Sequence, residues 1–312
     1  VEGSIDTAND VDLNLYVKGT KPNFDMLIAF APTDVIPILE QYKNAGEIYF
    51  YTSIQGPANK GNTPAINVDF GASKAFLENT ERHKRIDKMG FNGHFTNGEN
   101  RNASTMEFSL TDMTASLEKG EFEGSIFVKN FDNPEVEMKV NSNFNLDFIA
   151  KFLDLEQVQE ASGEVSLAMN FHDIIDIDKP ENALQKLNQA YFTELLIKDL
   201  SLVSEELPAP LHDMNVHLVM NGKEATLHQF EMLMGNSDLS ISGFLSDLPA
   251  IVHHTNIPVE THLDISSKYL DLAELTGFSR QDSNQRGFDE QIKDLRLGLS
   301  FKASAKDFTE SE

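Results

Sequence analysis

The sequence predicts a mainly β protein: an elongated, curved antiparallel β-sheet that forms a trough or groove, with a few short capping helices. Two observations lead to this prediction. Apolar and polar residues alternate along most of the chain, which is the period of strands with one buried face. In addition, a unit of strand, short helix and strand occurs near the middle of the chain and recurs on both sides of it.

The central unit begins at Pro134 and ends at Phe171. Its first strand has three apolar residues that alternate with charged ones: Val136, Met138 and Val140. Apolar residues at helical spacing then predict a short amphipathic helix over 145–155. A second alternating run follows Gly163 and contains Val165, Leu167 and Met169. All three elements therefore have one apolar face.

The unit recurs from Pro22 and from Pro258. The upstream copy has an alternating strand over 22–30, a short segment near Val35 and a strand over 46–54. The downstream copy has an alternating strand followed by a helical stripe over 269–275. We interpret residues 1–312 as one elongated segment with approximate repeats 1–130, 131–255 and 256–312, the last incomplete. Unrelated strands of an all-β chain could give the same matches.

The remaining patterns complete the predicted elements. Strands are expected over 11–17, 66–70, 91–95, 106–110, 113–117, 124–128, 195–203, 214–220, 225–234, 239–245 and 295–301. Helices are expected over 73–89 and 180–191, and Asn221-Gly222 indicates a tight hairpin. Roughly sixteen strands would make a flat sheet on the order of 75 Å wide. Open sheets beyond about ten strands curl or split, so both a trough and a sandwich remain open.

The composition excludes some classes of protein. The chain has 25 Lys and Arg against 50 Asp and Glu, a formal net charge of −25, which argues against nucleic acid as a partner. It has no cysteine, so disulfides and thiol chemistry are excluded. No apolar run reaches the ~18–20 residues of a membrane helix. Both ends of the sequence lie within alternating or polar stretches. We therefore expect a fragment of a longer, membrane-anchored chain.

No motif of the sequence indicates catalysis. There is no Gly-x-Ser-x-Gly, no phosphate-binding glycine loop and no dinucleotide fingerprint. Two groups among the nine histidines could suggest a metal, but none has the helical spacing of a zinc motif: His253, His254 and His262, and His212, His217 and His228. We therefore predict a protein that is not an enzyme and has no catalytic residue, metal or cofactor.

The spacing around the central unit resembles the C-terminal region of AsmA-like proteins. The matching residues are Gly124, Ile126, Val128, Asn130 and Pro134, followed by 146–155 and 163–169, and 243–275 matches a second time. That family is similar to TamB and to bridge-like lipid-transfer proteins with a repeating β-groove. The resemblance implies a periplasmic protein of a Gram-negative cell envelope, tethered to the inner membrane. It also implies a part in outer membrane biogenesis and a β-walled groove for phospholipid.

The candidate lipid-binding residues form the apolar wall of this groove. They are Phe24, Met26, Ile28, Phe30, Val136, Met138, Val140, Val165, Leu167, Met169, Leu239, Ile241, Leu263 and Ile265. The expected partners are phospholipid or another acyl-chain lipid, the envelope membrane through an anchor outside this segment, and envelope proteins of unknown identity. The alternative is a β-sandwich interaction or adhesion module of an exported protein, with a closed core.

Overall fold

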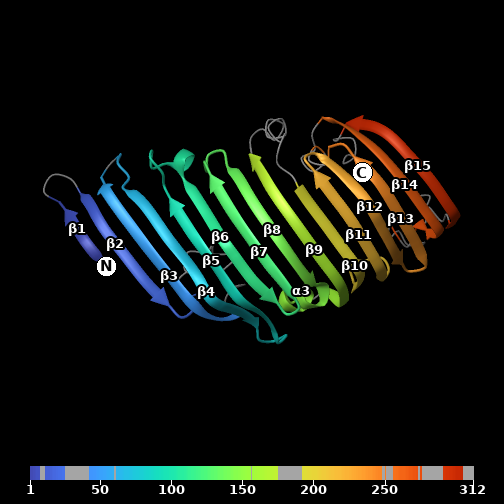
Figure 1. The fold of residues 1–312 in the computed structure, drawn as a ribbon, viewed down its shortest axis with the longest axis horizontal. Coiled ribbons are helices and arrows are strands. Elements are labelled where there is room, and N and C mark those ends of the chain that lie inside the picture. Colours follow the sequence, from blue (N-terminus) through green and yellow to red (C-terminus); the bar gives the residue numbers. More distant parts are fainter. Residues whose placement is uncertain are drawn as a thin grey trace, which may run out of the picture. The chain divides into compact units, whose positions relative to one another are not determined.

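The structure is a computed structural model that describes residues 1–7, 11–24, 42–59, 61–155, 157–174, 192–247, 250, 256–272, 275 and 291–304 (Figure 1). The chain divides into two compact units. Unit 1 consists of Val1–Ser142 and Phe171–Asp178, and unit 2 of Asn143–Asn170 and Lys179–Glu312. We describe each unit by itself.

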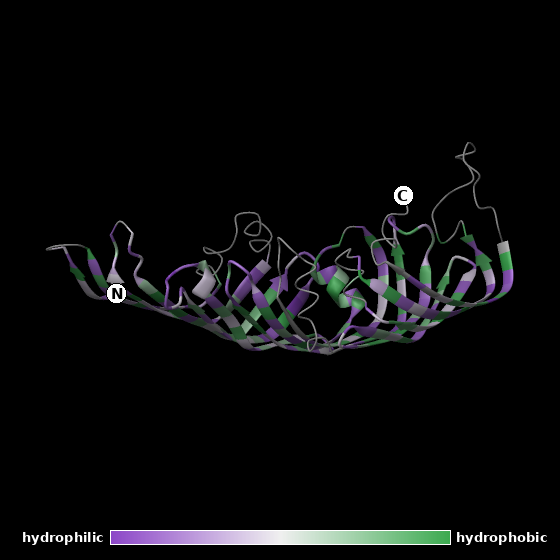
Figure 2. Cartoon of the chain, turned by 90° about the horizontal axis from the view of Figure 1, so that it is seen from above, coloured by the Kyte–Doolittle hydropathy of each residue, from purple (hydrophilic) through white to green (hydrophobic). Residues whose placement is uncertain are grey.

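The described residues are mainly β. Their fifteen strands belong to one antiparallel sheet, and the order of the strands in the sheet is their order in the sequence, β1 to β15 (Figure 1). The sheet of each unit is curved (Figure 2). The predicted fold class, a curved antiparallel sheet with a few short helices, is therefore confirmed. The approximate repeat boundaries stay a prediction.

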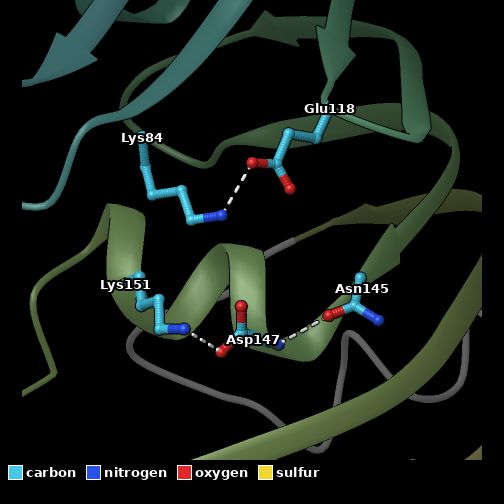
Figure 3. A network of polar contacts seen from close by, with 5 residues as sticks. All are labelled: Lys84, Glu118, Asn145, Asp147 and Lys151. Atoms are coloured by element: carbon cyan, nitrogen blue, oxygen red, sulfur yellow. Dashed lines mark hydrogen bonds and ion pairs between the residues drawn. The ribbon is translucent and has the colours of Figure 1, made fainter.

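Unit 1 contains the first eight strands and a single turn of 3-10 helix, η1 (Ala103–Thr105). The strands are β1 (Glu2–Asp6), β2 (Asp12–Lys21), β3 (Tyr42–Pro57), β4 (Ala65–Asn79), β5 (Lys84–Thr96), β6 (Glu107–Leu117), β7 (Gly120–Lys129) and β8 (Glu135–Asn145), the last up to Ser142. In the turn between β6 and β7, Glu118 pairs with Lys84 at the start of β5, with 2.6 Å between Nζ and Oε1 (Figure 3).

Unit 2 begins with the helix α3 (Leu146–Phe152). Its strands are β9 (Val158–Ile174), as far as Asn170, β10 (Phe192–Ser204), β11 (Leu211–Asn221), β12 (Glu224–Met234), β13 (Ser237–Leu245), β14 (Pro258–Asp271) and β15 (Gln291–Ser304). The hairpin predicted at Asn221-Gly222 is confirmed, because β11 ends at Asn221 and Gly222 has a φ of 61°.

The helix α3 confirms the predicted amphipathic helix, in a shorter form. The side chain of Asn145 caps it by accepting a hydrogen bond from the backbone N–H of Asp147 at 3.0 Å (Figure 3). Asp147 also pairs with Lys151 one turn later, at 2.6 Å. On the opposite side, Phe148 and Phe152 are 0 % and 4 % exposed. The helix therefore packs against the protein and does not project into solvent.

The helix predicted over 73–89 is wrong. This stretch contains the end of β4 and the start of β5, joined by a turn. An extra residue in each strand shifts the register near Lys74 and Lys88, both of which have positive φ. Apolar residues on one face are therefore three positions apart, as at Ala72 and Ala75, instead of two. That spacing imitates a helix.

Other expected elements fall partly or wholly outside the described residues. The strand expected from Pro22 is absent over 22–24, where the chain bends, and 25–30 lie outside the described residues. The helix expected over 180–191 also lies outside the described residues.

Similar bulges occur in the middle of both units. In unit 1 they interrupt the register of β4, β5 and β6, and Asp112 of β6 has a φ of 52°. In unit 2 they interrupt β10 and β11 at Asp199 and Asp213, with φ of 50° and 49°. A bulge bends its strand and increases the local twist. We attribute part of the curvature of each sheet to these positions.

The side-chain carboxylate of Asp238, in β13, is hydrogen-bonded to the backbone of β14. Asp238 accepts hydrogen bonds from the backbone N–H groups of Lys268 at 2.9 Å and Tyr269 at 2.8 Å. Burial alone would raise the pKa of the Asp238 carboxyl, but these hydrogen bonds outweigh it and hold the pKa below its usual value. The charged form therefore stabilises the folded state.

We predict that Asp238→Asn lowers the free energy of unfolding by about 1 kcal/mol at pH 7, since hydrogen bonds to a charged acceptor are lost. Because the folded pKa is the lower one, the charged form's contribution is present above the unfolded value of about 3.9. It disappears as the pH falls through the folded value. Urea unfolding at pH 7 and at pH 3 should therefore show a difference between variant and parent that shrinks in acid. The control Asp264→Asn, on the exposed face of β14, should change little at either pH; a difference for Asp238→Asn that stays constant with pH would contradict this account.

Candidate functional site

Two rows of register partners cross the sheet of unit 2, and almost every member is apolar. The first row is Val165, Ile197, Val216, Phe230, Ile241, Ile265 and Leu297. The second is Leu167, Leu195, Leu218, Leu227, Gly243, Leu263 and Leu299. Register partners lie on the same face of a sheet. We call the face that contains both rows the apolar face of unit 2.

The other face of unit 2 is polar. The next row of register partners there is Asn215, Glu231, Ser240, Ser266 and Arg296. Strand residues alternate between the faces, so this polar row comes from the same strands as the apolar ones. Each strand of unit 2 thus separates an apolar side from a side suited to water.

Unit 1 has the same division. One row of its apolar face is Val17, Thr52, Val68, Phe95, Phe108 and Val128, and the next is Gly19, Phe50, Phe70, Gly93, Leu110 and Ile126. The glycines of the second row are covered by rings: a Cβ on Gly93 would clash with the ring of Phe70, and a Cβ on Gly19 would lie 2.5 Å from the ring of Phe50. Aromatic side chains therefore fill this face closely.

The predicted wall residues of β8 join the apolar face of unit 1. Lys129 at the end of β7 pairs with Glu135 at the start of β8, at 3.1 Å, so these two side chains share one face. The neighbouring residues Val128 and Val136 consequently lie on the other. Met138 and Val140 follow Val136 at the strand period, so they share its face.

Buried residues occur on both apolar faces, some near strand ends and some at mid-strand, such as Ile48 of β3 and Val216 of β11. In unit 1, Phe24 packs on Ile48, Ala72 and Ala75. In unit 2 the cluster of Leu200, Leu211 and Met234 is covered by residues from outside the strands: Leu146 of α3, Leu207, Ala209 and Leu275. Toward the opposite ends of the strands, Ala250 packs with Val259. Figure 2 shows α3 on the concave side of the sheet, so the apolar face of unit 2 is the concave one.

The predicted wall residues belong to the less buried part of these faces. All that lie on described strands are half-buried: Val136, Met138, Val140, Val165, Leu167, Met169, Leu239, Ile241, Leu263 and Ile265. Phe24 is also half-buried, but it packs over the buried residues Ile48, Ala72 and Ala75. Met26, Ile28 and Phe30 lie outside the described residues. The structure thus brings Val165, Leu167, Leu239, Ile241, Leu263 and Ile265 together on one face.

The prediction did not include several residues of the same faces. Phe70, Phe95 and Phe108 of unit 1, and Ile197 and Phe230 of unit 2, belong to the apolar rows. Their signal was present in the sequence, because each belongs to an alternating run. Only the register between strands shows that these runs share a face.

The described part of the chain was also searched for metal sites, pockets and membrane-spanning helices. No three His, Asp or Glu side chains there are arranged to hold a metal ion. Two open depressions, of about 820 and 500 Å³, lie on β11–β15 and are lined mainly by polar-face side chains such as Asp213, Glu231 and Asp264. No helix among the described residues is long and apolar enough to cross a membrane.

Comparison of the chain with models of protein families, with curated proteins and with solved structures found no match. The functional interpretation consequently depends on the sequence pattern and on the geometry of the two faces.

Proposed function

We propose that the chain is a non-enzymatic lipid-binding and lipid-transfer segment of a periplasmic AsmA-like protein. Its apolar faces carry the acyl chains of phospholipids between the inner and outer membranes. The observation that carries this proposal is the apolar face of unit 2, where two rows of register partners cross seven strands and most of their side chains are half-buried. Such a face can still bury apolar surface of a ligand.

The dimensions of the apolar face suit an acyl chain. Seven strands, β9 to β15, cross unit 2. At about 4.8 Å between strands, the first row extends for roughly 29 Å. The hydrocarbon core of a bilayer, which contains two layers of acyl chains, is about 30 Å thick. One extended acyl chain therefore fits along a row, and each buried CH₂ contributes about 0.8 kcal/mol.

The chemistry of the face favours acyl chains of varied shape. Its rows combine branched aliphatic side chains with Phe230, and Met232 lies beside Leu239 at its edge. Methionine and phenylalanine adapt to ligands of irregular shape. In this proposal the head groups stay in water, so no selective head-group site is required.

The alternative, a closed sandwich, requires a second sheet against the apolar face. Every described strand belongs to the same sheet. The half-buried state of Leu167, Ile241 and Leu263 also suits an open face better than a sandwich core, where such residues are fully buried. These observations favour the acyl-binding function.

The test is to purify the protein without detergent from a Gram-negative host and to examine it by native mass spectrometry and lipid extraction. We expect bound phospholipid, released when the protein is unfolded. Repeated recovery of folded, monodisperse and lipid-free protein would count against the proposal.

A further inference from the structure

Two histidines from neighbouring strands meet on the polar face of unit 2. His217 of β11 and His228 of β12 have ring centroids 4.8 Å apart, with 39° between the ring planes. Figure 1 shows β11 and β12 side by side in the sheet. His217 is partly exposed and His228 exposed, so solutes can reach both rings.

A β-bulge brings these rings together. Val216 pairs with Phe230 and His217 with Gln229, but the next pair is Leu218 with Leu227, so β12 has one extra residue, His228. The register of β12 with β13 shows the same extra residue, between Leu227 and Phe230. Bulges re-aim side chains and are frequent at functional sites. Counted from Phe230 at the period of a regular strand, His228 would lie on the apolar face; the extra residue removes it from that alternation.

A carboxylate from a third strand orients one of the rings. Glu194 of β10 accepts a hydrogen bond from Nε2 of His217, with 3.1 Å between Nε2 and Oε1. This hydrogen bond places the proton of a neutral His217 on Nε2 and leaves Nδ1 with a free lone pair. Carboxylates hold metal-binding histidines in this way in many proteins.

We propose that His217 and His228 bind a divalent transition metal ion, with Glu194 as the positioning carboxylate. Imidazole nitrogens favour Zn²⁺, Cu²⁺ and Ni²⁺ over Mg²⁺ and Ca²⁺. A Zn²⁺ ion lies about 2.0–2.1 Å from each ligating nitrogen. Rotation of exposed side chains whose rings are already adjacent can supply that geometry.

The site has two protein ligands, and water completes the coordination. This agrees with the absence of any three-residue metal group among the described side chains. It also departs from the expectation that the histidines are not ligands. That expectation considered only spacing along the chain, whereas the bulge places His228 beside a histidine eleven positions earlier in the sequence.

The test is a titration of the full chain, cleared of metal by a chelator, with Zn²⁺ by isothermal calorimetry. We expect saturable binding that His217→Ala and His228→Gln each weaken at least about tenfold, and that the double variant does not weaken much further. Glu194→Gln should weaken binding by about tenfold, within the range measured for such carboxylates. Mg²⁺ at the same concentration should give no heat of binding.

The matched control is His94→Ala in unit 1. His94 also pairs with a carboxylate, Asp69, at 2.7 Å, and in the described structure no second histidine is stacked on it. This variant should bind Zn²⁺ like the parent. In NMR spectra, Zn²⁺ should shift the imidazole signals of His217 and His228 and leave that of His94 in place. Unchanged Zn²⁺ affinity in folded His217→Ala and His228→Gln variants would overturn the proposal, as would unmoved imidazole signals of this pair.

Discussion

Replacing Phe148 or Phe152 of α3 by alanine is expected to lower the free energy of unfolding by about 3–5 kcal/mol for each residue. Their side chains are 0 % and 4 % exposed, and their rings stack at 5.9 Å between centroids. Each substitution removes a buried ring and leaves a cavity. Because the two rings touch, the double variant should lose less than the sum of the single losses.

Urea unfolding of the single and double variants measures this loss. Hydrogen exchange should also rise first over 144–155, before the flanking strands open, since seven residues form a stable helix only through packing. Leu153→Ala is the matched control on the same segment, because Leu153 is 50 % exposed. A loss for Phe148→Ala as small as that for Leu153→Ala would show that the packing of α3 contributes little.

The second large effect compares a fully buried position on the apolar face of unit 1 with a half-buried one. Ile48 is fully buried and packs with Ala72 and Ala75, whereas Met138 is half-buried. In Ile48→Asp an unpaired charge is buried, which costs several kcal/mol of the roughly 5–15 kcal/mol that stabilise a domain. We expect this variant to unfold or to be insoluble. Met138→Asp should remain folded, because its carboxylate can reach water, but it should retain several-fold less lipid.

Circular dichroism during heating reports the fold of both variants, and mass spectrometry of lipid extracts reports the lipid that each retains. Lys139→Asp, at the adjacent exposed position of β8, is the control for added charge and should retain lipid like the parent. If Met138→Asp unfolds as completely as Ile48→Asp, its side chain lies in a closed core and the sandwich becomes the better interpretation.

The strands and their two faces could be predicted from the sequence because alternation is a local property. In β8, for example, Val136, Met138 and Val140 alternate with charged residues, and the structure has a strand there. The helix α3 was also predictable, since its buried residues Phe148 and Phe152 are one helical turn apart.

The bulges could not be predicted, because they depend on the pairing of two strands. At Ala72 and Ala75 a bulge gives apolar residues a helix-like spacing, and the predicted helix there was wrong. At His228 a bulge places a ring beside His217, which no sequence spacing indicates. The sequence also could not decide between an open face and a closed core, since both have the same alternation.

The most direct test of acyl binding is photo-crosslinking from neighbouring residues on opposite faces of one strand. A benzophenone side chain is placed at Leu167 of β9 or Leu263 of β14, on the apolar face, and at Ser166 or Asp264, the adjacent positions on the polar face. Each variant is irradiated in Gram-negative cells and analysed for lipid adducts by mass spectrometry. The proposed function predicts phospholipid adducts at Leu167 and Leu263 and none at Ser166 and Asp264. Folded variants with no adducts at Leu167 and Leu263, or with equal adducts on both faces, would contradict it.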